Sequence, residues 1–320
     1  MGNGGEFQGV VFMIKRLPTL TIGIPAYNEE RSLRDLLAQL SKQDFRLTRL
    51  TNIIIYSDGS TDRTVEVASQ FSNLPTSVIN QEHRKGKAYG LNQIIKKANT
   101  DVLVLLDADV VIRNKNTVDQ LAHRLLSEGF DLCAPKVLPL QNRGWMANIL
   151  IPSLVFKNQL FEKINAGNNI YTCHGRARAF SKRLYSQINF KDINEDAYSY
   201  LFCQYHNYKY QYLSNLIVYY HLPTNLPDHS LQSTRFFQSK KRSYIEFGEN
   251  FVKSAYSIPK WLFIKTFFIS SLKNRMLIPY AILTLYLSLK ARLINRITNT
   301  WTISKSSKNI KNIYNIKDNL

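Results

Sequence analysis

Short apolar runs alternate with stretches of helical period over the first third of the chain. Runs typical of buried strands cover residues 20–25, 52–56 and 101–106, and a weaker one covers 77–80. Between them, apolar residues recur at helical spacing at positions 33, 36, 37 and 40 and at positions 88, 91, 94, 95 and 98. Continuous apolar strands separated by amphipathic helices predict an α/β fold, with a Rossmann-like, mostly parallel sheet flanked by helices.

Segments that contain polar residues lie at the ends of three of these runs, at 25–29, 58–60 and 107–109. Ligands of parallel sheets bind beyond the carboxyl ends of the strands, so we expect these segments at one edge. Asp107 and Asp109 are two apart and share a face if the chain stays extended. Two hard carboxylates suit Mg²⁺ or Mn²⁺, which accepts substrate phosphates as further ligands. A solvated acidic turn would show the same pattern.

Four short motifs occur in order along the chain. They are IPAYNE at 24–29, SDGSTD at 57–62, KGK at 85–87 and DAD at 107–109. Together they resemble the family 2 glycosyltransferases of the GT-A fold, over roughly residues 18–240. The resemblance implies a nucleotide-sugar donor, a divalent cation and transfer with inversion at the anomeric carbon.

The resemblance also assigns roles to individual residues. Asp58 would contact the base, usually uracil, and the nucleoside pocket would be lined by Pro25, Ala26, Tyr27 and Glu29. Lys87 would lie near the nucleotide. Asp107 would touch the ribose or the metal, and Asp109 would ligate the metal that bridges the diphosphate.

An acidic pair, Glu195 and Asp196, introduces a further helical stretch. In the family, an acidic pair at this place supplies the general base, because an acceptor hydroxyl is a poor nucleophile until a carboxylate takes its proton. We assign this role to Asp196 and expect Glu195 to raise its pKa through like charge. An acidic pair favoured only by the helix dipole is the structural alternative.

Two other segments extend the resemblance. Residues 175–180 form a basic strand on the acceptor side, where Gly175 lets the backbone approach a ligand and Arg176 adds charge. A basic strand without a ligand is the alternative. Residues 232–236 resemble the QxxRW motif of processive members such as cellulose and hyaluronan synthases, with Gln232 and Arg235 toward the departing diphosphate. Phe236 replaces Trp and keeps an aromatic platform for the acceptor without the indole N–H.

The chain has 42 basic and 23 acidic residues, a formal charge of +19 over 320 residues. Such an excess favours binding to polyanions. A nucleic-acid-binding protein is therefore the alternative to an enzyme. No recognised nucleic-acid motif occurs, and we expect no such partner. A nucleotidyltransferase would need a glycine-rich loop where this chain has PAYNE. Three cysteines without a CxxC pair predict neither a disulfide framework nor a zinc site.

The composition becomes more apolar and more basic after residue 257. Apolar runs at 261–272 and 276–289 are shorter than the roughly 20 residues that span a bilayer. Bordered by Lys and Arg, they predict amphipathic helices in the headgroup plane of an anionic membrane. Packing onto the catalytic core is the alternative for these helices and for a further one at 148–164.

These patterns divide the chain into an N-terminal extension (1–17), a GT-A domain (18–257), membrane-associated helices (258–304) and a basic tail (305–320). We expect a peripheral or monotopic enzyme at the cytoplasmic face of a membrane. The acceptor is a glycan or a lipid-linked hydroxyl. Two roles stay open. One is cell-surface polysaccharide synthesis with a separate membrane transport subunit, and the other is single transfer to a lipid or polyprenyl phosphate.

Overall fold

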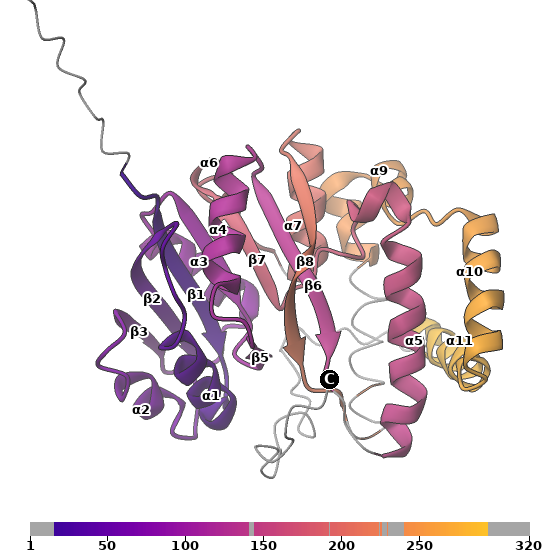
Figure 1. Cartoon of the computed structure of the whole chain (residues 1–320), viewed down its shortest axis with the longest axis horizontal. Helices are drawn as coiled ribbons and strands as arrows, with labels where there is room; N and C mark the ends of the chain where they lie inside the picture. The colour runs from indigo at the N-terminus through magenta and orange to yellow at the C-terminus, as the bar shows by residue number, and fades with distance from the viewer. Residues whose placement is uncertain are drawn as a thin grey trace, which may run out of the picture.

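The computed structural model describes residues 16–140, 144–191, 193–223, 225, 229 and 240–293. One twisted sheet runs through the molecule with helices on both faces, and three further helices stand beside its last strands (Figure 1). This arrangement confirms the predicted α/β class. All but the last two residues of the expected N-terminal extension, and all of the expected basic tail, lie outside the described part.

The sheet has eight strands in the order β3-β2-β1-β4-β7-β6-β8-β5. In chain order they are β1 (Thr19–Ala26), β2 (Arg49–Asp58), β3 (Thr76–Gln81), β4 (Val102–Leu106), β5 (Val110–Val111), β6 (Leu132–Pro139), β7 (Ala177–Ser181) and β8 (Tyr210–Tyr220). β1 pairs in parallel with β2 and β4, and β2 pairs in parallel with β3. The four strands predicted from apolar runs therefore form the expected parallel half of the sheet.

β7 reverses direction in the second half of the sheet. It runs antiparallel to β4 and β6, whereas β6 and β8 are parallel and β5 is antiparallel to β8. Ala177 at the start of β7 pairs with Leu106 at the end of β4. This register brings the residues before β7 beside the residues that follow β4, which include Asp107.

Alternate strand residues enter two apolar cores, one on each face of the sheet. Ile53 and Ile55 of β2 join one core, and Ile54 joins the other. The first core is covered by α1 (Glu30–Leu40), α2 (Thr64–Ser69) and α4 (Thr117–Ser127). The second is covered by α3 (Lys87–Lys97), α6 (Lys182–Tyr185), α7 (Glu195–Tyr205) and α9 (Glu249–Ala255).

A third apolar cluster joins the helices that stand beside the sheet. These are α5 (Trp145–Phe161), α10 (Lys260–Lys273) and α11 (Leu277–Leu293), and a short 3₁₀ turn (Ile164–Gly167) follows α5. They confirm the three helices expected from the sequence, with ends shifted by a few residues. In the part of the chain that is described, no helix has both the length and the hydropathy to cross a bilayer. The division of the chain at residue 257 stays a prediction.

Asp119 of α4 determines where β2 enters the sheet. Its buried carboxylate accepts hydrogen bonds from the backbone N–H groups of Arg46, Leu47 and Thr48 at 2.8–3.0 Å. The Thr48 hydroxyl donates a further bond at 2.7 Å. One side chain thus satisfies the donors that lead into β2.

Asp119→Ala should lower the free energy of unfolding by about 2–4 kcal/mol, because the buried N–H and hydroxyl of Thr48 and two partly buried N–H groups would lose their acceptor. Urea denaturation followed by circular dichroism measures the change. Asp44→Ala is the matched control, since this half-exposed carboxylate lies 3.9 Å from Arg46 and should contribute less than about 1 kcal/mol. Equal stability of the two variants would contradict the role given to Asp119.

Candidate functional site

Asp58, the last residue of β2, organises the loop that precedes α3. Its buried carboxylate accepts hydrogen bonds from the backbone N–H groups of Lys85 at 2.7 Å and Gly86 at 3.1 Å. Gly59 follows with φ +68°, a conformation that favours glycine. A Cβ there would lie 3.0 Å from the backbone nitrogen of Arg84. The strand end and the basic loop therefore form one unit.

The residues predicted to line a nucleoside pocket fall into two groups. Pro25 and Ala26 are buried within β1, and Ala26 belongs to the core beneath α1. Tyr27 and Glu29 lie beyond the strand end, where the guanidinium of Arg84 sits 3.8 Å from the centroid of the Tyr27 ring. Pro25 and Ala26 are thus part of the strand, whereas Tyr27 and Glu29 follow it, and their roles at a nucleoside stay predictions.

Lys87, the first residue of α3, joins two acidic residues from distant segments. Its Nζ lies 2.6 Å from Oδ1 of Asp107 and also contacts Oε1 of Glu195. Burial works to lower the pKa of Lys87, but the charges of Asp107 and Glu195 outweigh it and the pKa is raised. A cation at a helix N-terminus opposes the helix dipole, so these carboxylates stabilise an otherwise unfavourable position.

Asp107 and Asp109, just after β4, interact with different cations. Asp109 accepts hydrogen bonds from Arg176 at 3.1 and 3.2 Å, and the Asp107 N–H donates to the Arg176 carbonyl at 2.9 Å. The Arg176 guanidinium also lies 3.7 Å from the centroid of the Tyr220 ring. Burial raises the pKa of Asp107, Lys87 opposes this, and the charge of Asp109 adds to the rise. The two carboxylates are therefore close enough to interact electrostatically.

This carboxylate pair fits a divalent cation. The side chains of Asp107 and Asp109 are 20% and 23% exposed, so both can be reached from solvent. Mg²⁺ is commonly bound by one or two carboxylates together with water and substrate phosphates. Across the described residues, no group of three or more His, Cys, Asp and Glu side chains is placed to hold a metal. The donor pair suits an ion that is shared with a diphosphate.

Glu195 and Asp196 begin α7 in contrasting electrostatic surroundings. Burial works to raise the pKa of Glu195, but Lys87 and Arg178 lower it overall. Burial, followed by the charge of Glu195, raises the pKa of Asp196 to about 6. The charge of Glu195 raises the pKa of Asp196, as expected from the sequence, although burial raises it more. An ionised Glu195 thus stands beside a carboxyl group that titrates near neutrality.

Arg178, which the sequence analysis did not single out, anchors the acidic pair. Its buried guanidinium donates to the carbonyl of Glu195 and to the hydroxyl of Ser199, both at 2.6 Å. A Cβ on Gly175 would lie 3.3 Å from Oε1 of Glu195, so glycine allows this close approach. No local pattern in the sequence indicates this role, because both partners lie in α7, 17 and 21 residues further along the chain.

The remaining predicted residues, Gln232, Arg235 and Phe236, lie outside the described residues. Their roles at the diphosphate and the acceptor stay predictions. The three cysteines, Cys133, Cys173 and Cys203, are free and buried.

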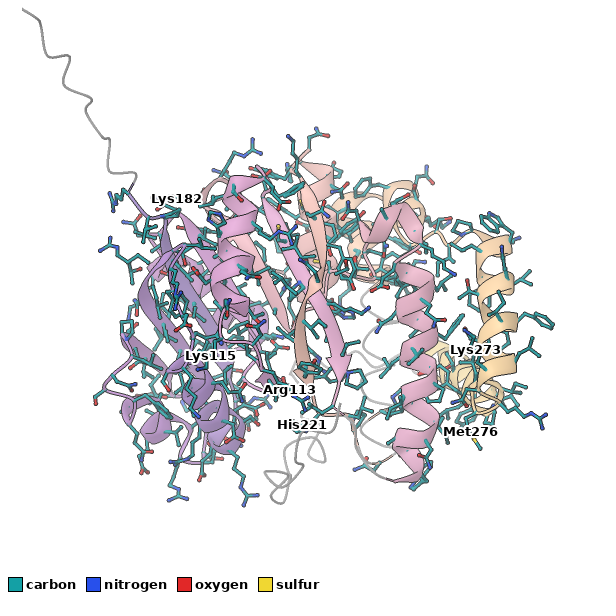
Figure 2. The ribbon with its side chains drawn as sticks, in the orientation of Figure 1. Arg113, Lys115, Lys182, His221, Lys273 and Met276 are labelled. Atoms are coloured by element: carbon teal, nitrogen blue, oxygen red, sulfur yellow. The ribbon has the colours of Figure 1, made fainter. Side chains whose placement is uncertain are left out.

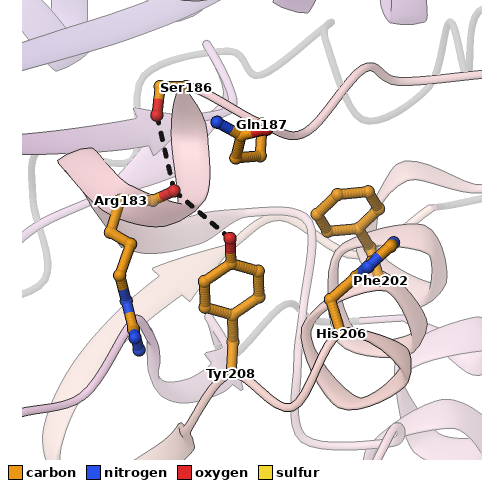
Figure 3. Close-up of a pocket in the computed structure, with 6 residues that line it drawn as sticks. All are labelled: Arg183, Ser186, Gln187, Phe202, His206 and Tyr208. Carbon is orange, nitrogen blue, oxygen red and sulfur yellow. Dashed lines mark hydrogen bonds between the residues drawn. The ribbon is translucent and has the colours of Figure 1, made fainter.

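A pocket of about 390 Å³ lies beside α6 and the end of α7 (Figure 3). Its lining residues are Arg183, Ser186, Gln187, Phe202, His206 and Tyr208. Ser181 at the end of β7 pairs with Val102 at the start of β4, so α6 follows at the edge opposite Asp107. The pocket is lined by no carboxylate, and it is separate from the candidate site.

Comparison with known proteins gives the family. The sequence model described as "Glycosyl transferase family 2" matches residues 21–188. A 4,4'-diaponeurosporenoate glycosyltransferase of Staphylococcus aureus (strain USA300) is 32% identical over 112 residues, which are 34% of this chain and 29% of that protein. The matched part therefore spans less than a third of the relative's length.

Solved structures share the fold at low sequence identity. A mannosyltransferase from Pyrobaculum calidifontis, in complex with GDP-Man and Mn²⁺, aligns with a TM-score of 0.60 and 16% identity over 87% of each chain. TarS 1–349 of S. aureus, in complex with UDP-GlcNAc, aligns with a TM-score of 0.56 and 21% identity over 71% of this chain and 66% of that one. Together with the family match over more than half of the sequence, the fold identifies this chain as a member of glycosyltransferase family 2 with the GT-A fold.

Proposed function

We propose that this glycosyltransferase moves a sugar from a UDP-sugar to a hydroxyl of a glycan or lipid-linked acceptor, with Mg²⁺ or Mn²⁺ as cofactor. Its main support is the meeting of Lys87, Asp107, Asp109, Glu195 and Arg176 at one edge of the sheet. The structural neighbours solved with UDP-GlcNAc, and with GDP-Man and Mn²⁺, support this class of donor and cation.

Asp196 is the proposed general base. Burial and the charge of Glu195 raise its pKa to about 6. A general base works best when its pKa lies near the operating pH, because it is then mostly ionised and still basic enough to accept a proton. The carboxylate takes the proton of the acceptor hydroxyl as that oxygen attacks the anomeric carbon. The bond from this carbon to the diphosphate breaks at the same time, and a single displacement of this kind inverts the anomeric configuration.

The other charged residues hold the reacting groups in place. Lys87 keeps Asp107 and Glu195 together, and Arg176 holds Asp109 against the segment before β7. When bound by Asp107 and Asp109, a divalent cation would stabilise the negative charge that develops on the leaving diphosphate. Tyr27 and Asp58 flank the basic loop at the proposed nucleoside end of the site.

Two kinds of acceptor remain within this proposal. Extension of a cell-surface polysaccharide rests on the resemblance of residues 232–236 to the motif of processive enzymes. Single transfer to a lipid or polyprenyl phosphate requires no processivity. Product length from one donor and one primer separates the two, since a processive enzyme makes long chains and a single-transfer enzyme adds one sugar.

Asp196→Asn should lower kcat for sugar transfer by about 10²–10⁴-fold, the usual contribution of a general base. In the wild type, kcat/KM should fall tenfold per pH unit below about pH 6, because protonation removes the base. Release of nucleoside diphosphate measures both effects. Glu128→Gln, which removes a carboxylate paired with Arg124 away from the site, is the control. An Asp196→Asn enzyme with wild-type turnover would exclude this base.

Glu195→Gln should move the acidic limb of the pH profile to lower pH. The substitution removes the negative charge that helps to raise the pKa of Asp196. Glu195→Asp keeps the charge and should leave the limb closer to its wild-type position. A limb that stays at the same pH in both variants would show that Glu195 does not act through Asp196.

Asp109→Asn should raise the Mn²⁺ concentration required for half-maximal activity by about tenfold or more, because a direct ligand is lost. Initial rates measured with a UDP-sugar across a Mn²⁺ titration give this value. Asp44→Asn, a half-exposed aspartate outside the site, should behave as wild type. Full activity of the wild-type enzyme in excess EDTA would contradict metal dependence.

A further inference from the structure

Helix α10 directs several large apolar side chains outward, whereas its inward side combines one leucine with two small polar residues. Its buried positions are Leu262, Thr266 and Ser270, and the Ser270 hydroxyl lies 3.3 Å from Oε1 of Gln159 in α5. The opposite side presents Trp261, Ile264, Phe268 and Leu272, each between 63% and 71% exposed. These four recur at helical spacing and form one stripe. A helix that faces water normally has the reverse pattern.

Helix α11 repeats this arrangement. Leu277 and Tyr280 are buried in the cluster shared with α5 and α10. Along its other side run Ile278, Ile282, Leu285 and Leu289, each between 50% and 66% exposed. Two packed helices that each expose a row of apolar side chains mark an interaction surface, because soluble proteins rarely expose large apolar patches. We call these eight residues the apolar stripes.

Basic residues surround the apolar stripes. Lys260, Lys265, Lys273 and Arg275 are exposed at the ends of α10, along it and in the turn that follows. Lys273 and Met276 lie where α10 passes into α11, on the far side of α5 from the sheet (Figure 2). The sequence has no aspartate or glutamate between Glu249 and Asp318. The surface therefore combines apolar side chains with positive charge that no acidic residue of the same segment balances.

We propose that the apolar stripes of α10 and α11 bind the surface of an anionic phospholipid bilayer. The apolar side chains would enter the boundary between headgroups and acyl chains, and Trp261 suits this interface because its ring is amphipathic. The basic residues would pair with lipid phosphates, each contributing about 1 kcal/mol near an anionic surface. A lipid surface matches both properties of the face at once.

A second copy of the chain fits this face less well. A twofold contact would place the surface against itself, and its basic residues would meet basic residues with no acidic residue in the segment to pair with them. Juxtaposed like charges weaken such an association. The bilayer is therefore the occupant that the charges favour.

The proposed membrane surface is joined to the candidate site through one packed cluster. That cluster includes Leu222, just after β8, and has Tyr220 packed against it. The ring of Tyr220 lies under the guanidinium of Arg176, which holds Asp109. Binding to a bilayer would thus keep the Asp109 side of the site next to the part of the molecule that meets lipid. Bilayer binding itself is independent of the proposed transfer reaction.

Vesicle co-sedimentation of the full chain tests the apolar part of the surface. We expect binding to vesicles of phosphatidylcholine and phosphatidylglycerol (about 7:3), and weakening by about thirtyfold or more in Ile264→Glu/Phe268→Glu, as two apolar side chains leave the interface. Leu17→Glu/Leu47→Glu is the matched control, because both leucines are exposed and precede β1 and β2. These strands lie at the other end of the molecule from α10 (Figure 1). Equal binding of both variants would overturn the proposal.

The charged part of the surface is tested in the same assay. Lys265→Gln/Lys273→Gln/Arg275→Gln should weaken binding to the anionic vesicles by about a hundredfold at low salt. Lys42→Gln/Lys96→Gln/Lys97→Gln removes the same charge from exposed sites elsewhere and should cause a much smaller loss. Equal losses in the two triple variants would indicate that only net charge matters and would overturn the assigned face.

Trp261 reports on the occupant directly. With Trp145→Phe and Trp301→Phe, its emission should shift to shorter wavelength on adding anionic vesicles and be quenched by brominated lipid. An emission already blue-shifted without vesicles, and unchanged by them, would show that another part of this chain covers the face. A dimer in analytical ultracentrifugation that Ile264→Glu/Phe268→Glu dissociates would assign the face to a second copy. Either result would overturn the proposal.

Discussion

The candidate site depends on one partly buried ion-pair network centred on Lys87. This lysine begins α3 and contacts Asp107 at the end of β4 and Glu195 at the start of α7, so it holds together segments that are far apart in the sequence. Buried charges are stable only when paired and hydrogen-bonded. Loss of the lysine would leave two carboxylates to repel one another at the point where the sheet meets α7.

The same network gives the neighbouring residues Glu195 and Asp196 different pKa values. Lys87 and Arg178 lower the pKa of Glu195, whereas burial and Glu195 raise that of Asp196 to about 6. Pairs of titratable groups whose surroundings push their pKa values apart are typical of acid–base catalysis. Arg176 neutralises Asp109 on the other side and rests on Tyr220, which packs against the cluster beneath the apolar stripes. The candidate site and the proposed membrane surface are thus parts of one packed arrangement.

The parallel half of the fold could be predicted from the sequence because its signals are local. Continuous apolar strands and amphipathic helices are visible in short windows, and parallel strands place their polar ends at one edge. The contact of Arg176 with Asp109 could not be predicted, since it depends on the antiparallel register of β7 against β4. Arg178 was missed because its partners, Glu195 and Ser199, belong to α7, and short windows of sequence do not show that contact. The orientation of α10 likewise depends on tertiary contacts, because its composition is apolar on most sides and only packing against α5 selects the inward face.

The most direct test of the account is a crystal structure of the enzyme with a UDP-sugar and Mn²⁺, with anomalous diffraction data at the manganese edge. We expect one manganese peak about 2.1 Å from carboxylate oxygens of Asp109, Asp107 or both, between these residues and the diphosphate. Asp196 should face the anomeric carbon from the side opposite the leaving group. A manganese peak remote from Asp107 and Asp109, or a donor sugar beyond the reach of Asp196, would contradict the proposed reaction.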